Sequence, residues 1–315
     1  MSKILITGGA GFIGSAMARK LAEFPGDQIV IVDNLLTGRK ENIPGSPFGN
    51  IRFIKGDVND FNDISGVFFA EKFDYVFHYA AMVGVKRTLN NPVSVLKDID
   101  GIKNILNLSK NTGVKRVYFS SSSEVYGEPF EIPQNESTTP LNSRLPYAIV
   151  KNVGEAYLRS YQQEFGLEYT IFRFFNTYGV NQSKDFVISK FLDAALNNRT
   201  LTIYGDGEQT RTFCYIDDNV DACERIFRQN EFVNDVVNIG SDVETPIIEL
   251  AQRIVSATDA QSAIEHLPPL KEGDMTRRRP DNTKMKEILN RELIPLDQGI
   301  QTIIDSLKPA ENVWN

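Results

Sequence analysis

Two residues of this sequence, Tyr147 and Lys151, have types and a spacing that suit acid–base chemistry. One turn of an α-helix would place both side chains on the same face. A lysine ammonium close to a phenol stabilises the phenolate and so lowers the pKa of the tyrosine. Such a tyrosine can remove the proton of a substrate hydroxyl while hydride leaves the same carbon. Since this spacing is also common by chance, the neighbouring motifs decide whether the chemistry applies.

A serine-rich segment, Phe119–Gly127, supplies hydroxyl groups that could share a site with Tyr147. It reads FSSSSEVYG and begins at the end of a predicted strand, so Ser122 would emerge at the carboxyl edge of a sheet. Open α/β sheets bind ligands at this edge. Glu124 in the same segment adds a carboxyl group that can carry protons. The segment therefore favours a functional role for the tyrosine and the lysine over a structural one.

Three glycines, Gly8, Gly11 and Gly14, follow the first predicted strand and open the first predicted helix. They allow a tight turn and a close approach of the backbone to a pyrophosphate, and the helix N-terminus attracts the anion. Asp33, 19 residues after Gly14, can accept hydrogen bonds from an adenosine ribose and would repel a 2′-phosphate, which favours NAD over NADP. A glycine-rich turn with a surface aspartate is the alternative, but the register of strand, glycines, helix and acid disfavours it. Asp57, after the third predicted strand, could contact the adenine or lie in a loop.

Short apolar or β-branched runs that alternate with helical patterns predict the elements that position these residues. Six predicted strands run over Lys3–Thr7, Gln28–Asp33, Ile51–Lys55, Tyr75–Ala80, Arg116–Ser121 and Glu168–Arg173. One predicted helix passes through Ile13, Met17 and Leu21, and another covers Val95–Leu108. The pattern predicts an α/β fold with a Rossmann-type doubly wound parallel sheet.

After about Tyr178 the pattern loosens, which predicts a smaller, mixed α/β C-terminal lobe. Its predicted elements are helices at Ile188–Leu196, Val220–Phe227 and Ile247–Ala257 and strands at Leu201–Tyr204 and Val236–Ile239. We expect residues 1–178 to bind the cofactor and residues 179–315 to bind the substrate, with an interleaved boundary. No repeat or flexible linker separates the two parts, so we expect them to dock tightly.

The composition argues against several classes of function. The 315 residues suit about two domains. Lys and Arg number 34 against 41 Asp and Glu, and the net charge of −7 lacks the basic surplus needed for nonspecific nucleic-acid binding. Only two histidines and two cysteines are present, so we expect no metal site and no disulfide framework. No apolar run is long enough for a signal peptide or a membrane span, so we expect a cytoplasmic protein without a membrane partner.

The motifs described above, together with RFFNTYG at Arg173–Gly179, resemble the extended short-chain dehydrogenase/reductase family of nucleotide-sugar epimerases, dehydratases and decarboxylases. The resemblance implies that a nucleotide-diphosphate sugar, UDP- or GDP-linked, binds between two lobes and that a resident NAD removes hydride from C4 of the sugar. It implies that Tyr147 is the base and that Lys151 holds the nicotinamide ribose and, together with the positively charged nicotinamide ring, lowers the pKa of this tyrosine. It also implies that Ser122 forms a hydrogen bond to the C4 oxygen. The cofactor-binding residues that we expect are Gly8, Gly11, Phe12, Ile13, Gly14, Asp33, Asn34, Asp57, Val58, Ala80, Tyr147 and Lys151.

The resemblance further implies residues that hold the substrate. Asn176 matches an asparagine that contacts the diphosphate, and Arg211 matches an arginine that clamps it. A guanidinium group suits phosphate oxygens geometrically. Within the RRRPD sequence of Arg277–Asp281, Arg278 matches an arginine that reaches the active site in decarboxylases. A solvated basic turn is the alternative for this segment.

The step after C4 oxidation depends on Glu124. Simple 4-epimerases usually carry threonine at this position, whereas the sequence from Ser122 to Glu124 resembles the Thr-Ser-Glu of uronate decarboxylases and GDP-mannose dehydratases. Beside a C4 ketone the C5 proton is acidic and a C5 carboxylate can leave, so a nearby carboxyl group can shuttle protons. We expect Ser123 and Arg144 to contact the substrate, although Arg144 could instead cap a loop. Residues 82–87 lack the Pro-Ala-Ser-Pro sequence usual in decarboxylases, so the match is partial.

Decarboxylation or dehydration is therefore the preferred hypothesis, and others stay open. A 4-epimerase, or a 4-dehydrogenase that releases the ketone, would use the same serine, tyrosine and lysine. A non-catalytic NAD-binding regulator is a remote alternative that a broken triad would indicate, and the triad is complete. The resemblance also implies a homodimer formed by the helix after Asn90-Asn91-Pro92 and the helix that carries Tyr147, although the apolar residues between Val95 and Leu108 also suit packing on the sheet.

Overall fold

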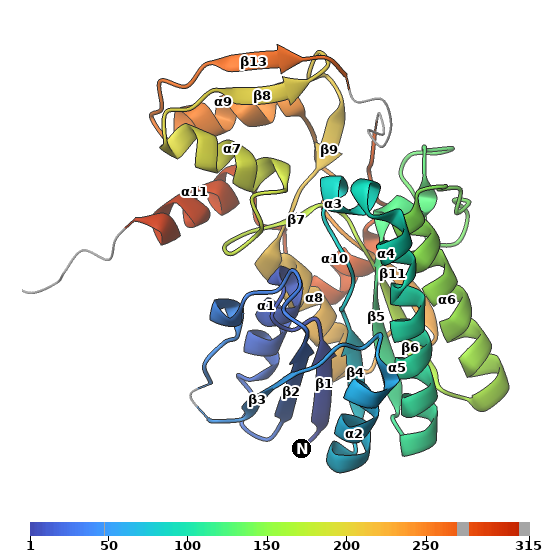
Figure 1. Ribbon diagram of the computed structural model, residues 1–315. Helices are drawn as coiled ribbons and strands as arrows, with labels where there is room; N and C mark the ends of the chain where they lie inside the picture. The colour runs from blue at the N-terminus through green and yellow to red at the C-terminus, as the bar shows by residue number, and fades with distance from the viewer. Residues whose placement is uncertain (47, 270–276, 309–315) are drawn as a thin grey trace, which may run out of the picture.

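In the computed structural model, which describes residues 1–46, 48–269 and 277–308, a seven-stranded parallel sheet forms the larger part of the protein (Figure 1). Its strands are β1 (Lys3–Thr7), β2 (Gln28–Asp33), β3 (Ile51–Lys55), β4 (Tyr75–His78), β5 (Arg116–Ser122), β6 (Glu168–Phe174) and β11 (Asp235–Ile239). They lie in the order β3-β2-β1-β4-β5-β6-β11. The six strands predicted from the sequence are confirmed, with β4 two residues shorter and β5 and β6 one residue longer than predicted. The order reverses at β1 and β4, and such a switch point opens a crevice for ligands at the carboxyl ends of the strands.

The seventh strand, β11, differs from the prediction. The sequence analysis assigns Val236–Ile239 to the C-terminal lobe, but β11 pairs with β6 in the main sheet, with Val237 opposite Phe172. Helix α8 (Ile216–Gln229) precedes β11 and packs against α1 (Phe12–Leu21), so it also belongs to the sheet half of the protein. The pattern of a short buried strand does not say which sheet the strand joins, so the sequence could not reveal this pairing.

Helices cover both faces of the sheet, as Figure 1 shows. α1 and α8 share a core with one face, whereas α2 (Phe61–Glu71), α5 (Asp98–Thr112) and α6 (Pro146–Phe165) share a core with the other. Alternation along β1 sends Ile4 into the first core and Leu5 into the second. Among the residues described, no helix combines the length and the apolar character needed to cross a membrane.

The region between β4 and β5 contains three helices, α3 (Val85–Asn90), α4 (Pro92–Leu96) and α5. The sequence analysis predicts a single helix over Val95–Leu108, but Lys97 separates α4 from α5. α5 ends at Gly113, whose φ of +82° is the left-handed C-cap conformation that glycine favours. The interruption places the start of α5 beside the carboxyl end of β4.

The smaller lobe stands over the carboxyl ends of the strands (Figure 1). It contains α7 (Val187–Leu196), β8 (Leu201–Tyr204), β9 (Thr210–Thr212), β12 (Glu244–Pro246), α9 (Ile247–Ala257), β13 (Ile264–Leu267) and α11 (Leu296–Leu307). β8 pairs with β13 in parallel, and β9 pairs with β12 antiparallel. The predicted elements that became α7, β8 and α9 are confirmed. β9 and β12, with three residues each, are too short to show a period in the sequence. β13 is as long as β8, but its two central residues, Glu265 and His266, are polar and exposed, so it does not form an apolar run.

The chain passes between the two parts several times. The short strand β7 (Thr177–Tyr178) leaves the sheet and pairs with β10 (Cys214–Tyr215), which leads into α8. After β13 the chain returns through α10 (Thr283–Leu289), which packs against α8 and β11. The two parts are therefore interleaved in sequence.

Candidate active site

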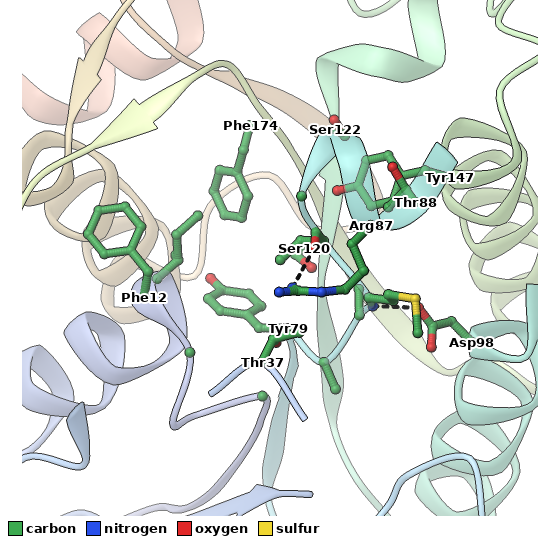
Figure 2. A pocket seen from close by; sticks show the side chains of 18 of the residues that line it. Phe12, Thr37, Tyr79, Arg87, Thr88, Asp98, Ser120, Ser122, Tyr147 and Phe174 are labelled. Carbon is green, nitrogen blue, oxygen red and sulfur yellow. Dashed lines mark hydrogen bonds between the residues drawn. The ribbon is translucent and has the colours of Figure 1, made fainter. Parts of the chain in front are cut away.

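A cavity of about 800 Å³ lies between the carboxyl ends of the strands and the smaller lobe. The glycine turn, the serine-rich segment, the tyrosine–lysine pair and the loop before α7 all contribute to its lining. Every site residue predicted from the sequence lines this cavity, except Arg144 and Arg211. Figure 2 shows Ser120, Ser122 and Tyr147 facing the same space. The switch point of the sheet thus gathers residues that are far apart in the chain.

The glycine turn leaves no room for side chains at Gly8 and Gly14. Gly8 has a φ of +69°, and a Cβ there would lie 2.6 Å from the backbone nitrogen of Ala80. A Cβ on Gly14 would lie 2.3 Å from the carbonyl oxygen of Gly8. Gly11 is the N-cap of α1 and provides no side-chain cap, which leaves the first N–H groups of the helix for a ligand, and the residues from Gly11 to Gly14 line the cavity. These features fit a pyrophosphate held at the helix N-terminus.

The end of β2 fits an adenosine ribose. Asp33 is 8% exposed, and its carboxylate accepts hydrogen bonds from the backbone N–H groups of Ala10 (3.0 Å) and Leu35 (2.8 Å). Burial raises the pKa of Asp33, while these two N–H groups oppose the rise. Beside it, Asn34 Nδ2 donates to Asp57 Oδ2 (3.1 Å). A buried carboxylate at this point suits ribose hydroxyls and repels an additional phosphate.

We expect Gly11→Ala to weaken NAD binding about tenfold, or about 1.4 kcal/mol. A Cβ at Gly11 would meet only the carbonyl oxygen of Gly8, at 3.1 Å, so the fold can accept it. The added methyl group would keep a pyrophosphate away from the turn. Calorimetric titration with NAD measures the effect. The control is Gly26→Ala, because a Cβ there meets nothing within 4 Å; equal affinity in both variants would contradict the proposed cofactor position.

Lys151 is buried at the base of the cavity. It is 3% exposed, its Nζ lies 3.3 Å from Ser120 Oγ, and the same atom is 5.7 Å from the centre of the Tyr147 ring. Burial lowers the pKa of Lys151 to about 8, and the negative charge of Asp98 opposes this shift. The structure thus holds a lysine that can lose its proton only slightly above neutral pH.

The stability difference between Lys151→Met and the wild type should depend on pH. Lysine ordinarily titrates at 10.5, whereas the pKa of Lys151 in the folded chain is about 8. Between these values the unfolded wild type binds more protons than the folded protein, so its free energy of unfolding rises with pH. From about pH 7.5 to about pH 9.5, the wild type should gain about 2 kcal/mol relative to the variant.

Urea unfolding of both proteins at the two pH values measures this change. Every other titrating group is common to the two proteins, so its contribution cancels. A constant difference would mean that the pKa of Lys151 is not lowered.

The residues around Tyr147 act on the pKa of its phenol. Burial raises this pKa, the negative charge of Glu124 raises it further, and a hydrogen bond with Ser122 opposes the rise. The sequence-based expectation that Lys151 and a positively charged nicotinamide ring together lower this pKa concerns the cofactor-bound site, and it stays a prediction.

Glu124 and Arg278 form an ion pair in the cavity. Arg278 Nη2 lies 2.8 Å from Glu124 Oε1, and the two side chains are 7% and 20% exposed. The second carboxyl oxygen, Oε2, is buried and has no hydrogen-bond partner among the described residues. Glu124 lies in the short helix η2 (Ser123–Tyr126), where Ser122 Oγ accepts from the Glu124 N–H (3.2 Å). The neighbouring Arg277 turns outward and pairs with Glu244, so of these two arginines it is Arg278 that reaches the site.

The predicted substrate-binding residues fall into two groups. Asn176 lines the cavity with a φ of +33°, and its Nδ2 is buried without a hydrogen-bond partner among the described residues. Ser123 also lines the cavity. Arg211 lies in β9 and donates to the carbonyl oxygen of Thr210 (2.7 Å), outside the cavity lining. Arg144 is exposed and also lies outside the lining.

Three charged residues of the cavity lining, Arg87, Lys97 and Asp98, are absent from the set predicted from the sequence. Asp98, at the start of α5, accepts a hydrogen bond from the Met82 N–H (2.7 Å). Arg87 extends from α3 toward Asp185 in the loop before α7, at 3.5 Å, and Figure 2 shows both Arg87 and Asp98 in the lining. An acid in the first turn of a helix is ordinary, so the sequence carried no separate signal for Asp98. Arg87 stands in the segment that the sequence analysis noted only as a departure from the decarboxylase pattern.

One family profile and several known proteins resemble this chain. The profile of the NAD dependent epimerase/dehydratase family matches residues 4–240. UDP-N-acetyl-alpha-D-glucosaminuronate decarboxylase of Bacillus cytotoxicus is 38% identical over 328 residues, which span 98% of this chain and 99% of that protein. UDP-glucuronic acid decarboxylase 1 of Danio rerio is 36% identical over 311 residues, which span 96% of this chain and 72% of that protein. The structure of UDP-glucose 4-epimerase from Thermotoga maritima with UDP-glucose has a TM-score of 0.89 at 34% identity and covers 96% of this chain and 97% of that one.

Proposed function

This chain belongs to the NAD dependent epimerase/dehydratase family, and from that premise we propose that it decarboxylates a nucleotide-linked uronic acid through a 4-keto intermediate. NAD is the cofactor of the family, and the glycine turn and Asp33 fit it. The observation that carries the proposal is the ion pair between Glu124 and Arg278, which brings an acid and a cation into the same cavity as Tyr147.

The first step is oxidation at C4 of the sugar. In this step Tyr147 accepts the proton of the C4 hydroxyl, and Ser122, which hydrogen-bonds Tyr147, orients the C4 oxygen. The ammonium group of Lys151 lies near the ring of Tyr147. Bound NAD supplies the hydride acceptor and a positive ring that opposes the raised pKa of the tyrosine.

The second step uses the C4 ketone, because the carboxylate on C5 is β to this ketone. The bond between C5 and the carboxyl carbon breaks, CO₂ leaves, and the electron pair forms an enolate on the C4 oxygen. C5 then takes a proton from an acid. Return of the hydride to C4 and of a proton from Tyr147 to the C4 oxygen, the reverse of the first step, would complete the cycle. We propose that Arg278 leaves its pairing with Glu124 to attract the substrate carboxylate, and that Glu124 then takes up a proton from solvent and carries it to C5. Its buried Oε2, which has no hydrogen-bond partner among the described residues, is available for this transfer.

The nucleotide that we propose is UDP. The three similar proteins described above carry UDP-sugars in their names. Asn176 supports a diphosphate, because its buried Nδ2 has no hydrogen-bond partner among the described residues and lies in the cavity lining. A hydrogen bond from this Nδ2 to a phosphate oxygen would remove the free-energy cost of a buried donor without a partner.

The test is to purify the protein, identify the bound cofactor, and incubate it with UDP-glucuronate, UDP-N-acetylglucosaminuronate, UDP-glucose and GDP-mannose. Mass spectrometry and absorbance in the NADH band follow each reaction. Loss of CO₂ from a uronate is the expected result. Loss of water from a neutral sugar, or no reaction with any uronate, would contradict decarboxylation.

A 4-epimerase is the second candidate. Residues 82–87 lack the sequence usual in decarboxylases, and the Thermotoga maritima structure covers 96% of this chain. An unchanged mass with a new C4 stereoisomer of UDP-glucose would establish this alternative.

The homodimer stays a prediction. Val93 and Leu96 on α4 and Ile149 on α6 are exposed apolar side chains that a partner could cover.

A further inference from the structure

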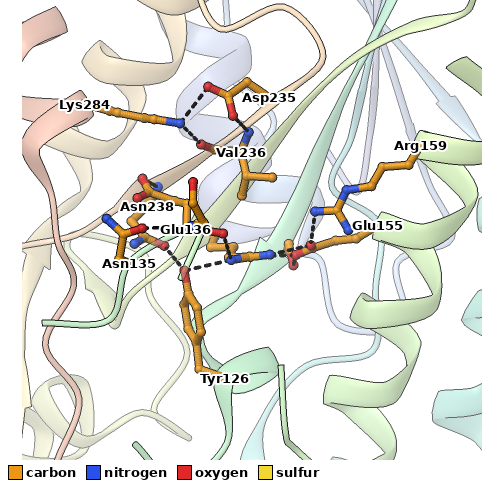
Figure 3. A network of polar contacts seen from close by, with 12 residues as sticks. Tyr126, Asn135, Glu136, Glu155, Arg159, Asp235, Val236, Asn238 and Lys284 are labelled. Atoms are coloured by element: carbon orange, nitrogen blue, oxygen red, sulfur yellow. Dashed lines mark hydrogen bonds and ion pairs between the residues drawn. The ribbon is translucent and has the colours of Figure 1, made fainter. Parts of the chain in front are cut away.

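A buried polar network lies behind the cavity (Figure 3). At its centre, Arg173 of β6 donates from Nε to Glu155 Oε1 (2.9 Å) and from Nη2 to Glu155 Oε2 (2.7 Å). Both side chains are at most 1% exposed. Glu155 Oε1 also accepts from Ser121 Oγ (2.7 Å). Since Glu155 lies on α6 and Ser121 on β5, these bonds fix the helix that carries the tyrosine and lysine against the strand end that faces them.

The network continues through a tyrosine and an asparagine. Arg173 Nη1 donates to the Tyr126 hydroxyl (2.8 Å), and this hydroxyl donates to Asn238 Oδ1 (2.8 Å). Asn238 Nδ2 donates to the carbonyl oxygens of Gln134 (2.9 Å) and Asp281 (3.1 Å). Tyr126 and Asn238 are at most 1% exposed, so water does not compete for these bonds.

The segment 277–281 is held at the far end of this network. The N–H of Gln134 donates to the carbonyl oxygen of Arg279 (2.8 Å), and the N–H of Asp281 donates back to the carbonyl oxygen of Gln134 (2.8 Å). Asn135 Nδ2 also donates to Asp281 Oδ2 (3.0 Å). The backbone that carries Arg278 is therefore bonded on one side to the loop at Gln134 and on the other to Asn238.

These contacts close into a ring. Tyr126 and Glu124 both belong to η2. From Tyr126 the ring passes through Asn238 to the segment 277–281, and from that segment Arg278 reaches back to Glu124 at 2.8 Å. One buried hydrogen bond, from Tyr126 to Asn238, therefore joins the acid and the cation of the proposed second step from behind.

We propose that Tyr126 and Asn238 are positioning residues that hold Arg278 against Glu124 for the step that follows C4 oxidation. This inference rests on the proposed function, because the ring is assigned to the decarboxylation step of the proposed reaction. Glu155 serves the other step, since its bonds to Arg173 and Ser121 fix α6 against β5. The Tyr126 hydroxyl joins the two halves of the network.

Removing this hydroxyl affects the two halves differently. In Tyr126→Phe, Glu155 keeps its two bonds from Arg173 and its bond from Ser121, so α6 keeps its register. Asn238 Oδ1 loses its donor, so only the two Nδ2 bonds, to the carbonyl oxygens of Gln134 and Asp281, then orient this amide, and η2 is no longer bonded to it. Even a small displacement of Arg278 would lower the rate of the step after C4 oxidation, because this rate depends on the geometry of the reacting groups.

The experiment compares Tyr126→Phe with the wild type by hydrogen exchange and by product analysis with UDP-glucuronate. We expect faster amide exchange in residues 277–282 and unchanged exchange in residues 147–155. We also expect unchanged formation of the 4-keto sugar, with the ratio of released 4-keto sugar to decarboxylated product raised on the order of tenfold or more. The control is Tyr161→Phe on α6, where the lost hydroxyl donates to Asn107 Oδ1 at the surface (2.9 Å).

An unchanged ratio, or an equal loss in both steps, would overturn the positioning role. If the wild type does not act on a uronate, the proposed function fails, and the exchange of residues 277–282 still decides whether the ring holds this segment. If Tyr126→Phe does not fold, Asn238→Ala replaces it, because it removes the other partner of the same hydrogen bond together with the donor to Asp281. The same change in exchange and product ratio is then expected, and its absence overturns the inference.

Discussion

Tyr147→Phe should lower turnover by a factor of about 10² to 10⁴ and leave the affinity for UDP-sugars nearly unchanged. Phenylalanine keeps the ring in its place on α6 but removes the hydroxyl that accepts the C4 proton. Because this proton must leave before or with the hydride, the loss falls on the first step and no 4-keto sugar forms. Steady-state kinetics, together with calorimetric titration of a UDP-sugar, separates the two effects.

Tyr161→Phe is the matched control for this prediction, since it removes a hydroxyl from the same helix at the protein surface. It should behave like the wild type. Turnover of Tyr147→Phe close to that of the wild type would contradict the mechanism. Loss of UDP-sugar binding together with turnover would instead assign Tyr147 to substrate binding.

Glu124→Gln should block the second step by about 100-fold or more while C4 oxidation continues. Glutamine has nearly the same shape but carries no proton that it can exchange, and it removes the charge that pairs with Arg278. Incubation with a UDP-uronate should therefore accumulate the 4-keto intermediate. Mass spectrometry of the quenched reaction measures the intermediate and the decarboxylated product together.

The same variant should change the pH dependence of C4 oxidation. The charge of Glu124 raises the pKa of Tyr147, so its removal lowers that pKa. The rate of C4 oxidation should then rise at a lower pH than in the wild type, because the pKa of Tyr147 is higher in the wild type. Glu265→Gln, at an exposed position of β13, is the control. Unchanged decarboxylation in Glu124→Gln would remove Glu124 from the proton transfer.

Local patterns were sufficient to predict the elements that hold the cofactor. The run over Gln28–Asp33 alternates with helical segments and ends in an acid, and the structure has β2 over the same residues. Glycines with a fixed spacing specify a turn because only a residue without a Cβ fits there, as the 2.3 Å contact at Gly14 shows. Each of these features depends on residues close together in the chain, so a single sequence contains the information.

The other half of the site depends on contacts that no local pattern contains. Arg278 meets Glu124 because a returning segment is bonded to Asn238, and the sequence alone could not select it by geometry among three adjacent arginines. Arg211 has the right type and motif but lies in β9, outside the cavity lining. The causes that raise the pKa of Tyr147 are of the same kind, because burial and the charge of Glu124 both depend on the tertiary fold.

β11 follows its partner β6 only after a long stretch of sequence, and this separation affects the synthesis of the protein on the ribosome. β6 is complete at Phe174, but its outer edge stays open until Asp235–Ile239 has been translated and paired with it. During this interval a strand with apolar residues such as Ile171 presents free N–H and C=O groups, which other chains can pair with. A fragment that ended near residue 178 would keep this edge permanently, so we expect it to aggregate rather than to fold as a separate cofactor-binding domain.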